Sequence, residues 1–521
     1  MPEKIYNTVG INMLSCLQYQ YERVHWYYQN QRVKNKMLSL ILIFIACILI
    51  GTTGWVLKTF GEVTYSQIMF HIYQPQFFEP RLVESWAKRS LILAFAVVLG
   101  VSLLYYMAVK LRPLWKNYLH RACKIGAWLF LTSSFLYTIC RLNLVVVAEY
   151  FMHKNNLQYS DFYEKNYVFP DSVNITFPES KKNLIVIFAE SMETGFMNPY
   201  YFGDNLMPEL TKLASENLNF SDTEKIGGGF QFDGINFTQG GLLAQYCGLP
   251  LKVPMFDRSD AFNPDGGLFN HAVCLSNILA INGYAQSFMI GTPAEFSDTD
   301  GFLQSHGNVR LLDQQALTGT NRNNLKRHIK DADIFEYAKR EITALSEQNK
   351  PFAFTVMTMD THFGTDTFDK RVCPKKYPRK KRINNVISCG DMQIADFVKW
   401  IKAQPFADNT VIAVLDDHLM MKGNVWKKGD DRRVFNLFIN APQSEYRYNR
   451  HFTAMDIFPT LVESLGAQIE GRRLGLGTSL YSDEKTLLEQ GYSVEELSNE
   501  LALPSRLYNY FLLGIPLNAE N

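Results

Sequence analysis

The sequence predicts a membrane anchor of three transmembrane helices, followed by one α/β sandwich domain with a mainly parallel central sheet. Two observations support this prediction. Three apolar stretches lie before residue 150, each close to the roughly 20 residues that cross a hydrocarbon core. After residue 180, short apolar runs typical of buried parallel strands alternate with helix-like segments.

The apolar stretches cover residues 37–57, 91–109 and 126–148. The first lies too far from the N-terminus to be a removable signal peptide, and it lacks a small-residue cleavage site. Buried helices of a soluble protein are the alternative, but three such stretches so close together argue against it. The third stretch contains Arg141, which we expect to extend toward the outer headgroups, with a contact to a lipid phosphate as the alternative.

Basic residues near the ends of the stretches predict the orientation of the anchor. They cluster before the first stretch and between the second and third, so both segments are expected in the cytoplasm. Three crossings then place everything after residue 149 outside it. The predicted organisation is a cytoplasmic segment (1–36), a membrane region (37–149), a connector (150–180) and an external domain (181–521).

The overall charge does not indicate nucleic acid as a partner. The chain has 52 basic and 51 acidic residues, whereas nucleic-acid binding usually requires a clustered basic surface. One local basic run consists of Lys375-Lys376 and residues 379–382. We expect it to form a solvated loop, with a contact to anionic lipid or lipopolysaccharide as the alternative.

Four of the eight cysteines lie in the predicted external domain, an even number in an oxidising compartment. Their spacing favours the disulfides Cys247–Cys274 and Cys373–Cys389, although four cysteines allow three pairings. The paired C-x-x-C spacing of a structural zinc site is not found between them.

Three predicted strands end directly before candidate catalytic residues. Strands at 183–189, 351–359 and 410–415 are followed by Glu190, by Asp360-Thr361-His362 and by Asp416-Asp417-His418. Another strand is predicted at 434–439, and helices at 207–216, 333–347 and 392–403. Active sites of parallel sheets lie at the carboxyl ends of the strands, so we expect these polar residues to meet there.

Carboxylates and an imidazole at these strand ends suit a divalent cation such as Zn²⁺ or Mn²⁺. Buried acids without a cation would be costly. We expect one of Asp416 and Asp417 to cap the following turn and the other to bind the metal with His418. Glu190 is a candidate ligand from a second strand, and helix capping is an equally good explanation for it.

A glycine-rich segment, residues 227–241, carries Thr238 near an expected helix start. A helix N-terminus offers free N–H groups to a phosphate. A metal can also lower the pKa of a threonine hydroxyl and make it a nucleophile. Thr238 is therefore the candidate nucleophile, and an ordinary N-cap is the alternative.

Together these residues resemble the alkaline-phosphatase/sulfatase superfamily, and within it the membrane phosphotransferases. That group includes lipoteichoic acid synthases, phosphoethanolamine transferases and the phosphoglycerol transferases of periplasmic glucans, which this chain resembles most. The likeness covers about residues 183–480. The segments that carry it are 237–251, Cys274 with 283–284 and 305–307, 359–362, 417–426, 431–432 with 436–438, and 474–477.

The resemblance implies that Glu190, Thr238, Asp417 and His418 hold one divalent metal, either Mn²⁺ or Zn²⁺, with Mg²⁺ as a further candidate. Thr238 would pass through a phospho-threonine intermediate, and His362 would contact the phosphate or the leaving alcohol. The donor would be a phospholipid headgroup, phosphoglycerol or phosphoethanolamine, and the acceptor a periplasmic glycan or lipopolysaccharide. The chain would be a multi-pass protein of the bacterial inner membrane, surrounded by membrane lipids, with its catalytic domain in the periplasm.

The sequence departs from the family pattern in two places. Segment 291–300 lacks the tryptophan and arginine that bind phosphoglycerol in lipoteichoic acid synthases, and the anchor has fewer spans than is common in the family. The candidate substrate contacts are Asp298, Asp300, His306 and Trp426. The acidic loop around Asp298 would suit the amine of phosphoethanolamine, whereas the motif likeness favours phosphoglycerol.

The sequence also bears on three alternative functions. A formylglycine sulfatase needs a C/S-x-P-x-R motif, and the arginine is missing after both Thr238 and Cys247. A phosphodiesterase would use the same metal and threonine, with water as the acceptor. A non-catalytic membrane-anchored module that binds lipid or protein would have no reason to keep Thr238 beside the metal ligands.

Overall fold

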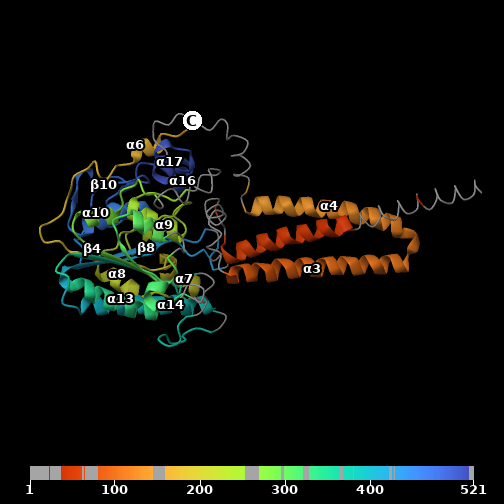
Figure 1. The fold of residues 1–521 in the computed structure, drawn as a ribbon, viewed down its shortest axis with the longest axis horizontal. Coiled ribbons are helices and arrows are strands. Elements are labelled where there is room, and N and C mark those ends of the chain that lie inside the picture. The colour runs from red at the N-terminus through yellow and green to blue at the C-terminus, as the bar shows by residue number, and fades with distance from the viewer. Residues whose placement is uncertain are drawn as a thin grey trace, which may run out of the picture. The chain divides into compact units, whose positions relative to one another are not determined.

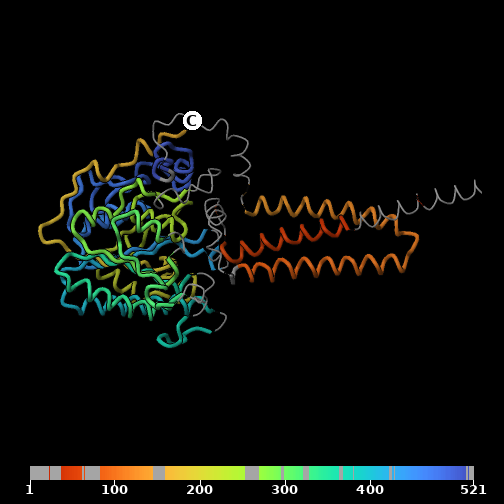
Figure 2. The backbone as a smooth tube through the Cα atoms, viewed as in Figure 1, coloured from red at the N-terminus to blue at the C-terminus, as the bar shows by residue number. Residues whose placement is uncertain are grey.

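The computed structural model describes residues 23, 37–61, 64, 80–142, 144, 159–252, 269–294, 299–320, 328–362, 368–378, 381–421, 425–427 and 429–514 (Figures 1 and 2). The chain divides into two compact units. One comprises Met1–Lys58 with Phe78–Ala148, and the other comprises Thr59–Phe77 with Glu149–Asn521.

The first unit contains three helices that are long and apolar enough to cross a membrane, Met37–Thr59, Val83–Leu111 and Pro113–Arg141. The last two comprise α3 (Pro80–Leu111), the 3₁₀ helix η2 (Pro113–Trp115) and α4 (Lys116–Arg141). The hydroxyls of Thr53 and Thr138 lie 2.9 Å apart, so polar groups inside this unit satisfy one another. The three predicted helical stretches are confirmed, and they fit a membrane anchor.

The third helix is shifted from the predicted stretch 126–148. It begins at Lys116 and ends at Arg141, with Leu142 as its C-cap. Arg141 therefore lies in the last helical turn, at the end of the candidate span. A positive charge there interacts favourably with the helix dipole.

The second unit is built on a seven-stranded sheet with the order β3-β8-β7-β2-β6-β4-β5. Five neighbouring strands are parallel, whereas β3 and β8 add an antiparallel edge. The strands are β2 (Asn183–Phe188), β3 (Gly228–Gly229), β4 (Ala285–Ile290), β5 (Arg310–Leu312), β6 (Phe352–Met357), β7 (Thr410–Leu415) and β8 (Val434–Ile439). Every residue of β2, β6, β7 and β8 is buried, which explains their unbroken apolar sequences.

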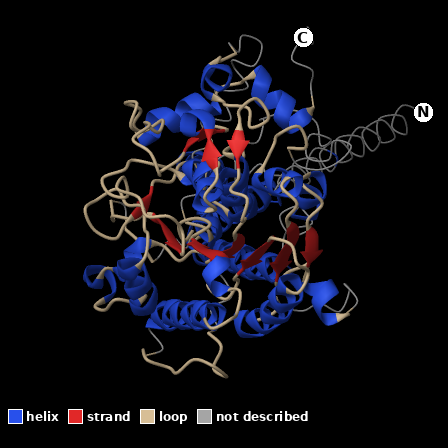
Figure 3. Cartoon of the chain, turned by 90° about the vertical axis from the view of Figure 1, so that its left-hand side faces the viewer, coloured by secondary structure: helices blue, strands red, loops and turns tan. Residues whose placement is uncertain are grey.

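Helices cover both faces of this sheet, which makes the predicted α/β sandwich (Figures 1 and 3). Alternate residues of β2 enter different cores, because successive strand side chains point to opposite faces. Leu184, Val186 and Phe188 belong to one core, and Ile185 and Ile187 belong to the other.

The first core is packed by α6 (Phe162–Asn166), α9 (Thr238–Cys247), α10 (Leu275–Ile281), α15 (Ile457–Ser464), α16 (Val494–Ala502) and α17 (Arg506–Leu513). The second is packed by α8 (Pro208–Glu216), α13 (Asp331–Ser346) and α14 (Arg382–Lys402). Shorter elements are η4 (Thr194–Met197), α7 (Pro199–Phe202), α11 (Thr299–Ser305), α12 (Gln314–Thr318), η9 (Ala407–Asn409), η10 (Ala454–Asp456) and η11 (Glu470–Arg472). Two small antiparallel pairs complete the unit, namely β1 (Ile175–Thr176) with β9 (Gln468–Ile469), and β10 (Arg473–Leu474) with β11 (Gly477–Thr478).

Both predicted disulfides are present. Cys247 at the end of α9 is bonded to Cys274, the N-cap of α10. Cys373 is bonded to Cys389 within α14. Each bond closes a chain loop and so reduces the conformational freedom of the unfolded state.

Candidate active site

The loops that follow β2, β6 and β7 meet at one edge of the sheet. Strand β2 lies between the other two, and its last residue, Phe188, pairs with Met357 on one side and Leu415 on the other. The three chain segments therefore leave the sheet side by side. Glu190 lies in the first of these loops, and Asp417 and His418 lie in the third.

The structure brings these three predicted ligands together. One ligand atom from each of Glu190, Asp417 and His418 lies within 4.8 Å of the others. The Nε2 atom of His418 is 3.4 Å from Oδ2 of Asp417 and 3.7 Å from Oε1 of Glu190. All three side chains are buried.

This donor set fits a divalent cation. Oε2 of Glu190 and Oδ2 of Asp417 are buried and have no hydrogen-bond partner among the described residues. A buried carboxylate oxygen without a partner is costly, and two in one pocket with an imidazole are the ligands that Zn²⁺ and Mn²⁺ take.

Burial and the neighbouring charges of this cluster shift the pKa values of Asp417 and His418. Burial, followed by the Glu190 carboxylate, raises the pKa of Asp417 to about 7. Burial acts to lower the pKa of His418, but Asp417 and Glu190 outweigh it, so that pKa is raised. A bound cation would oppose both shifts, because it favours the carboxylate and the neutral imidazole.

Thr238 is the first residue of α9, and the N-cap is Phe237. The alternative that Thr238 is an N-cap is therefore wrong. Its Oγ1 lies 3.3 Å from Nε2 of His418, and the residue is half-buried. The helix can approach this closely because Gly241 has no side chain, since a Cβ there would lie 2.1 Å from the carbonyl oxygen of Asp417.

Two threonines from the loop after β6 hold the main chain of Glu190. Thr358 accepts the Glu190 N–H through Oγ1 at 3.0 Å, and the Thr361 hydroxyl donates to the Glu190 carbonyl. The next residue, Ser191, has a left-handed φ of 54°, and its N–H donates to Oδ1 of Asp417 at 3.0 Å. A non-glycine residue in this conformation is held by its surroundings, as is typical of functional sites.

The expected division of roles between Asp416 and Asp417 is wrong. Asp417 is both anchor and candidate ligand, because Oδ1 accepts N–H groups from Ser191 and His418 while Oδ2 stays without a partner. Neither carboxylate oxygen of Asp416 has a partner among the described residues. Burial and then Asp417 raise the pKa of Asp416 well above its ordinary value.

The orientation of His418 is set by its own loop. Nδ1 lies 3.0 Å from the Leu419 carbonyl, so Nδ1–H donates there. In the neutral ring, which is the form that binds a metal, Nε2 then carries the lone pair. The Leu419 N–H in turn donates to Oε1 of Gln231 at 2.7 Å. The sequence analysis missed Gln231, whose only sequence signal is its place in the glycine-rich segment.

A buried ion pair, also missed, fixes the same loop. Glu193 binds Arg432 through two bonds of 2.6 and 2.7 Å, and Arg432 also donates to the Met420 carbonyl at 2.8 Å. The Met420 N–H donates back to Glu193 at 3.3 Å. Arg432 stands in a segment that carried the family likeness, which was the available signal for it.

A second acidic cluster lies at the end of β6. Asp360 accepts bonds from His328 Nε2 at 2.9 Å and from Lys330 Nζ at 2.7 Å. Asp331 accepts the N–H groups of Met359 and Asp360, and burial followed by Asp360 raises its pKa well above the ordinary value. This cluster holds the segment that carries Thr358, Thr361 and His362.

The other predicted site residues are distributed as follows. The His362 N–H donates to the Met359 carbonyl at 3.1 Å, in the loop that holds Glu190. The Asp300 carboxylate accepts the N–H of Gly301 in its own helix α11. Asp298 lies outside the described residues. Trp426 packs against Phe196, and the Arg432 guanidinium lies 4.8 Å above its ring.

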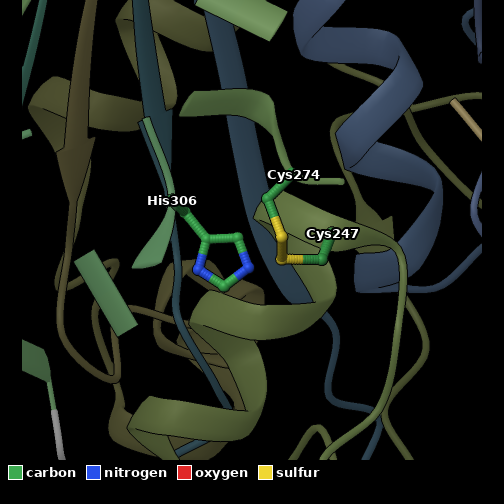
Figure 4. A group of neighbouring side chains, drawn as sticks. All are labelled: Cys247, Cys274 and His306. Carbon is green, nitrogen blue, oxygen red and sulfur yellow. A yellow bond between two sulfur atoms is a disulfide. The ribbon is translucent and has the colours of Figure 1, made fainter. Parts of the chain in front are cut away.

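The structure gives His306 a different position from the predicted substrate contact. It is fully buried beside the Cys247–Cys274 disulfide (Figure 4). Its ring nitrogens face the carbonyls of Phe302 and Phe269 at 2.7 and 3.0 Å. We therefore no longer assign His306 to substrate binding. Its two cysteine neighbours are bonded to each other, so they offer no thiolate to a metal.

The fold and site define an α/β domain in which a cluster of candidate metal ligands lies beside a threonine at a helix N-terminus. The chain belongs to the sulfatase family, whose model matches residues 182–467. Phosphoglycerol transferase I of Escherichia coli is 33% identical over 320 residues, which are 59% of this chain and 40% of that protein. The enzyme of the same name from Escherichia fergusonii is 32% identical over 322 residues, again 59% of this chain and 40% of that protein. This chain thus spans about two fifths of the length of these relatives.

One of the solved structures that this chain resembles is the lipoteichoic acid synthase LtaP from Listeria monocytogenes. The sequence identity is 16% and the TM-score is 0.47, over 60% of this chain and 79% of that one. A protein of the alkaline phosphatase superfamily from Vibrio parahaemolyticus has 20% identity and a TM-score of 0.46 over 60% of this chain and 73% of that one.

Proposed function

We propose that this chain is a membrane-anchored transferase that moves a phospholipid headgroup through a phospho-threonine at Thr238 to a glycan or lipopolysaccharide hydroxyl. One observation carries this proposal. The Thr238 hydroxyl lies 3.3 Å from His418 Nε2, beside a buried cluster of three candidate metal ligands. A binding module would have no need for a nucleophile in that position.

Glu190, Asp417 and His418, with the Thr238 hydroxyl, would hold one divalent cation. When bound, the cation supplies Lewis acidity, which lowers the pKa of a neighbouring hydroxyl and offsets negative charge on a phosphate. We favour Mn²⁺ or Zn²⁺, because the set contains an imidazole as well as carboxylates. The buried, unpartnered oxygens of Glu190 and Asp417 support this assignment.

The transfer reaction would proceed in two steps. In the first, Thr238 Oγ1 attacks the phosphorus of the lipid phosphodiester, a Thr–O–P bond forms, and the bond to the lipid alcohol breaks. The alcohol leaves with a proton, and His362 is the candidate group at that oxygen. In the second, an acceptor hydroxyl attacks the phosphorus, an acceptor O–P bond forms, and the Thr–O–P bond breaks. The proton that the acceptor loses returns to the Thr238 oxygen. Free N–H groups in the first turn of α9 would face the phosphate in both steps.

The relatives named phosphoglycerol transferase I favour phosphoglycerol as the transferred group, with phosphoethanolamine as the second candidate. Two disulfides in the catalytic domain support an oxidising compartment, so we place the domain in the periplasm and the anchor in the inner membrane as a multi-pass segment. The substrate contacts that we still propose are Asp298, Asp300 and Trp426.

The test is the intact mass of the purified full chain after incubation with Mn²⁺ or Zn²⁺ and vesicles of phosphatidylglycerol and phosphatidylethanolamine. We expect an added phosphoglycerol or phosphoethanolamine group on the peptide that contains Thr238, and none on the Thr238→Ala variant. An adduct that remains in Thr238→Ala would refute the nucleophile. Release of free headgroup phosphate to water at the full rate, without an acceptor, would instead favour a phosphodiesterase.

A further inference from the structure

Two chain segments that leave the same edge of the sheet lie side by side away from the metal ligands. One is α7, which follows Glu190 by nine residues. The other is the loop that precedes α14, which starts from the end of β6. Lys381 Nζ donates to the Phe202 carbonyl at 3.3 Å, and the Tyr377 hydroxyl donates to Asp204 at 2.6 Å. Figure 1 shows α7 beside α14.

The surface formed by these segments is unusual in its composition. Tyr200 is 86% exposed although it is aromatic, and Val372 is 44% exposed. Four exposed basic side chains accompany them, and none of the four forms an ion pair with a carboxylate among the described residues. We name this surface the aromatic–basic rim: Tyr200, Val372, Lys375, Lys376, Lys381 and Arg382.

The acids near the rim do not cancel its charge. Asp204 is one exposed carboxylate beside it, where it accepts the Tyr377 hydroxyl. Glu209 is another, because Glu209 and Lys376 both lie near Asp391. The neighbouring Arg371 is already neutralised by Asp333 and Asp369, so we leave it out of the rim. Four positive charges therefore outnumber these two exposed negative charges.

The rim is also fixed to the domain. The disulfide Cys373–Cys389 ties the loop to α14, and Asn385 accepts the N–H groups of Lys376 and Tyr377 at 2.9 Å each. A basic loop held in this way presents its charge as a fixed patch. Exposed aromatic and basic side chains together are the composition that binds the interface of an anionic bilayer.

We propose that the aromatic–basic rim docks the catalytic domain onto the surface of an anionic phospholipid bilayer. Tyr200 enters the headgroup layer, and the four basic side chains contact lipid phosphates. This docking goes beyond the proposed transfer reaction, because it holds whichever headgroup or acceptor the site uses. It would present the edge of the sheet that carries Glu190 and Thr238 to the lipid surface.

The test is photocrosslinking of the full chain in proteoliposomes, with Tyr200→p-benzoylphenylalanine in a Thr238→Ala background so that turnover plays no part. The matched control is Ile281→p-benzoylphenylalanine. Ile281 is 85% exposed but ends α10 at the opposite, amino edge of the parallel strands. We expect a lipid adduct at position 200 in phosphatidylglycerol vesicles that exceeds the adduct at position 281 by about tenfold or more.

A separate variant tests the role of the positive charges of the rim. It combines Lys375→Gln, Lys376→Gln, Lys381→Gln and Arg382→Gln. Each basic side chain at an anionic surface contributes about fivefold in binding, so the adduct at position 200 should fall by about fivefold or more. The control removes four exposed charges elsewhere on the domain and should leave the adduct unchanged: Arg340→Gln, Lys350→Gln, Lys399→Gln and Lys402→Gln.

Three outcomes would overturn the proposal. One is an adduct at position 200 that is no greater than at position 281. Another is an equal adduct in purely phosphatidylcholine vesicles. The third is crosslinking at position 200 to a second copy of the chain instead of lipid. None of these outcomes depends on headgroup transfer, so failure of the docking and failure of the proposed function can be told apart.

Discussion

The buried ion pair between Glu193 and Arg432 gives the sharpest test of how the active-site loop is held. Arg432→Met removes the guanidinium, including its contact with the Trp426 ring, and leaves an unbranched apolar side chain in its place. It leaves Glu193, which is fully buried, without its charged partner, and it frees the Met420 carbonyl, two residues after His418. We therefore expect loss of both stability and cation affinity.

The magnitude follows from burial. Removing one partner of a buried ion pair costs about 3–5 kcal/mol. The Arg432 side chain is 22% exposed, so we expect the lower end, about 3 kcal/mol. In a domain of this size that corresponds to a fall in melting temperature of about 5 °C or more.

Arg371→Met is the matched control. Arg371 also makes short bonds to carboxylates, Asp333 and Asp369, but its side chain is 59% exposed. Asp369 is buried, but solvent around the exposed guanidinium screens the pair, so we expect Arg371→Met to cost less than Arg432→Met. The geometry of the two arginines is similar, so the comparison isolates burial.

The assay is thermal unfolding of the purified full chain, followed by calorimetric titration with Mn²⁺ or Zn²⁺. We expect Arg432→Met to melt well below Arg371→Met and to bind the cation about tenfold more weakly, as is typical when groups that orient metal ligands are lost. Equal melting temperatures for the two variants would refute the reasoning that the Glu193 pair is buried and unscreened. Unchanged cation affinity would show that the loop after His418 does not need Arg432.

Three further predictions follow from the same structure. A divalent cation at a hundred times its dissociation constant should stabilise the wild-type chain by about 2.7 kcal/mol, measured as a rise in melting temperature, and Glu190→Gln should remove that rise. Burial raises the pKa of Asp391 to about 7, so its contribution to stability is complete below the ordinary pKa of 3.8 and is lost as the pH rises through 7. The wild-type melting temperature should therefore fall between about pH 4 and about pH 7, and Asp391→Asn should flatten that profile; a profile unchanged by the substitution would contradict the assignment. Replacing Cys373 and Cys389 together by Ser should lower the free energy of unfolding by about 3 kcal/mol, given their separation of 16 residues, and no change in melting temperature would show that the bond is not formed in the protein.

The sequence predicted the strands that are buried on both faces and missed those that are not uniformly apolar. β2, β6, β7 and β8 stand out because all their residues are buried. β4 begins with Ala285, Gln286 and Ser287, and β5 has only three residues with an exposed arginine, so neither has a continuous apolar sequence. Sheet pairing, which a local pattern does not contain, defines these strands.

Helix α14 shows that local sequence patterns also fail to predict where some helices begin. It begins at Arg382, ten residues before the predicted start at 392. Its first turns contain Asn384, Asn385, Ser388 and Asp391, which read as a polar loop, yet all four are buried. Some of these side chains bind groups outside the helix, such as the N–H groups of Glu209 and Leu210 on Asp391. A polar residue with a distant buried partner cannot be recognised from its neighbours in sequence.

The candidate metal ligands were predictable because each stands directly after a strand, and the family likeness assigned them roles. The groups that orient these ligands could not be predicted from the sequence. Gln231, Glu193 and Arg432 act through single hydrogen bonds to the loop after His418, and no spacing rule links them. The structure places His306 beside the Cys247–Cys274 disulfide, where its buried ring faces main-chain oxygens, and a motif alone does not distinguish such a packing role from substrate binding.

The main chain of the site is held by protein hydrogen bonds before any cation is considered. Thr358 and Thr361 hold Glu190, Asp417 holds Ser191, and Leu419 orients His418. Among the described residues, the carboxylate oxygens of this site that remain without a hydrogen-bond partner are Glu190 Oε2, Asp417 Oδ2 and both oxygens of Asp416. Hydrogen bonds formed on folding therefore position the ligands. A bound cation would offset the energetic cost of their buried, unpartnered carboxylate oxygens. Such a site differs from a zinc finger, in which the metal itself organises the fold, because removing the cation here should cost affinity for the phosphate while the sheet and its loops stay in place.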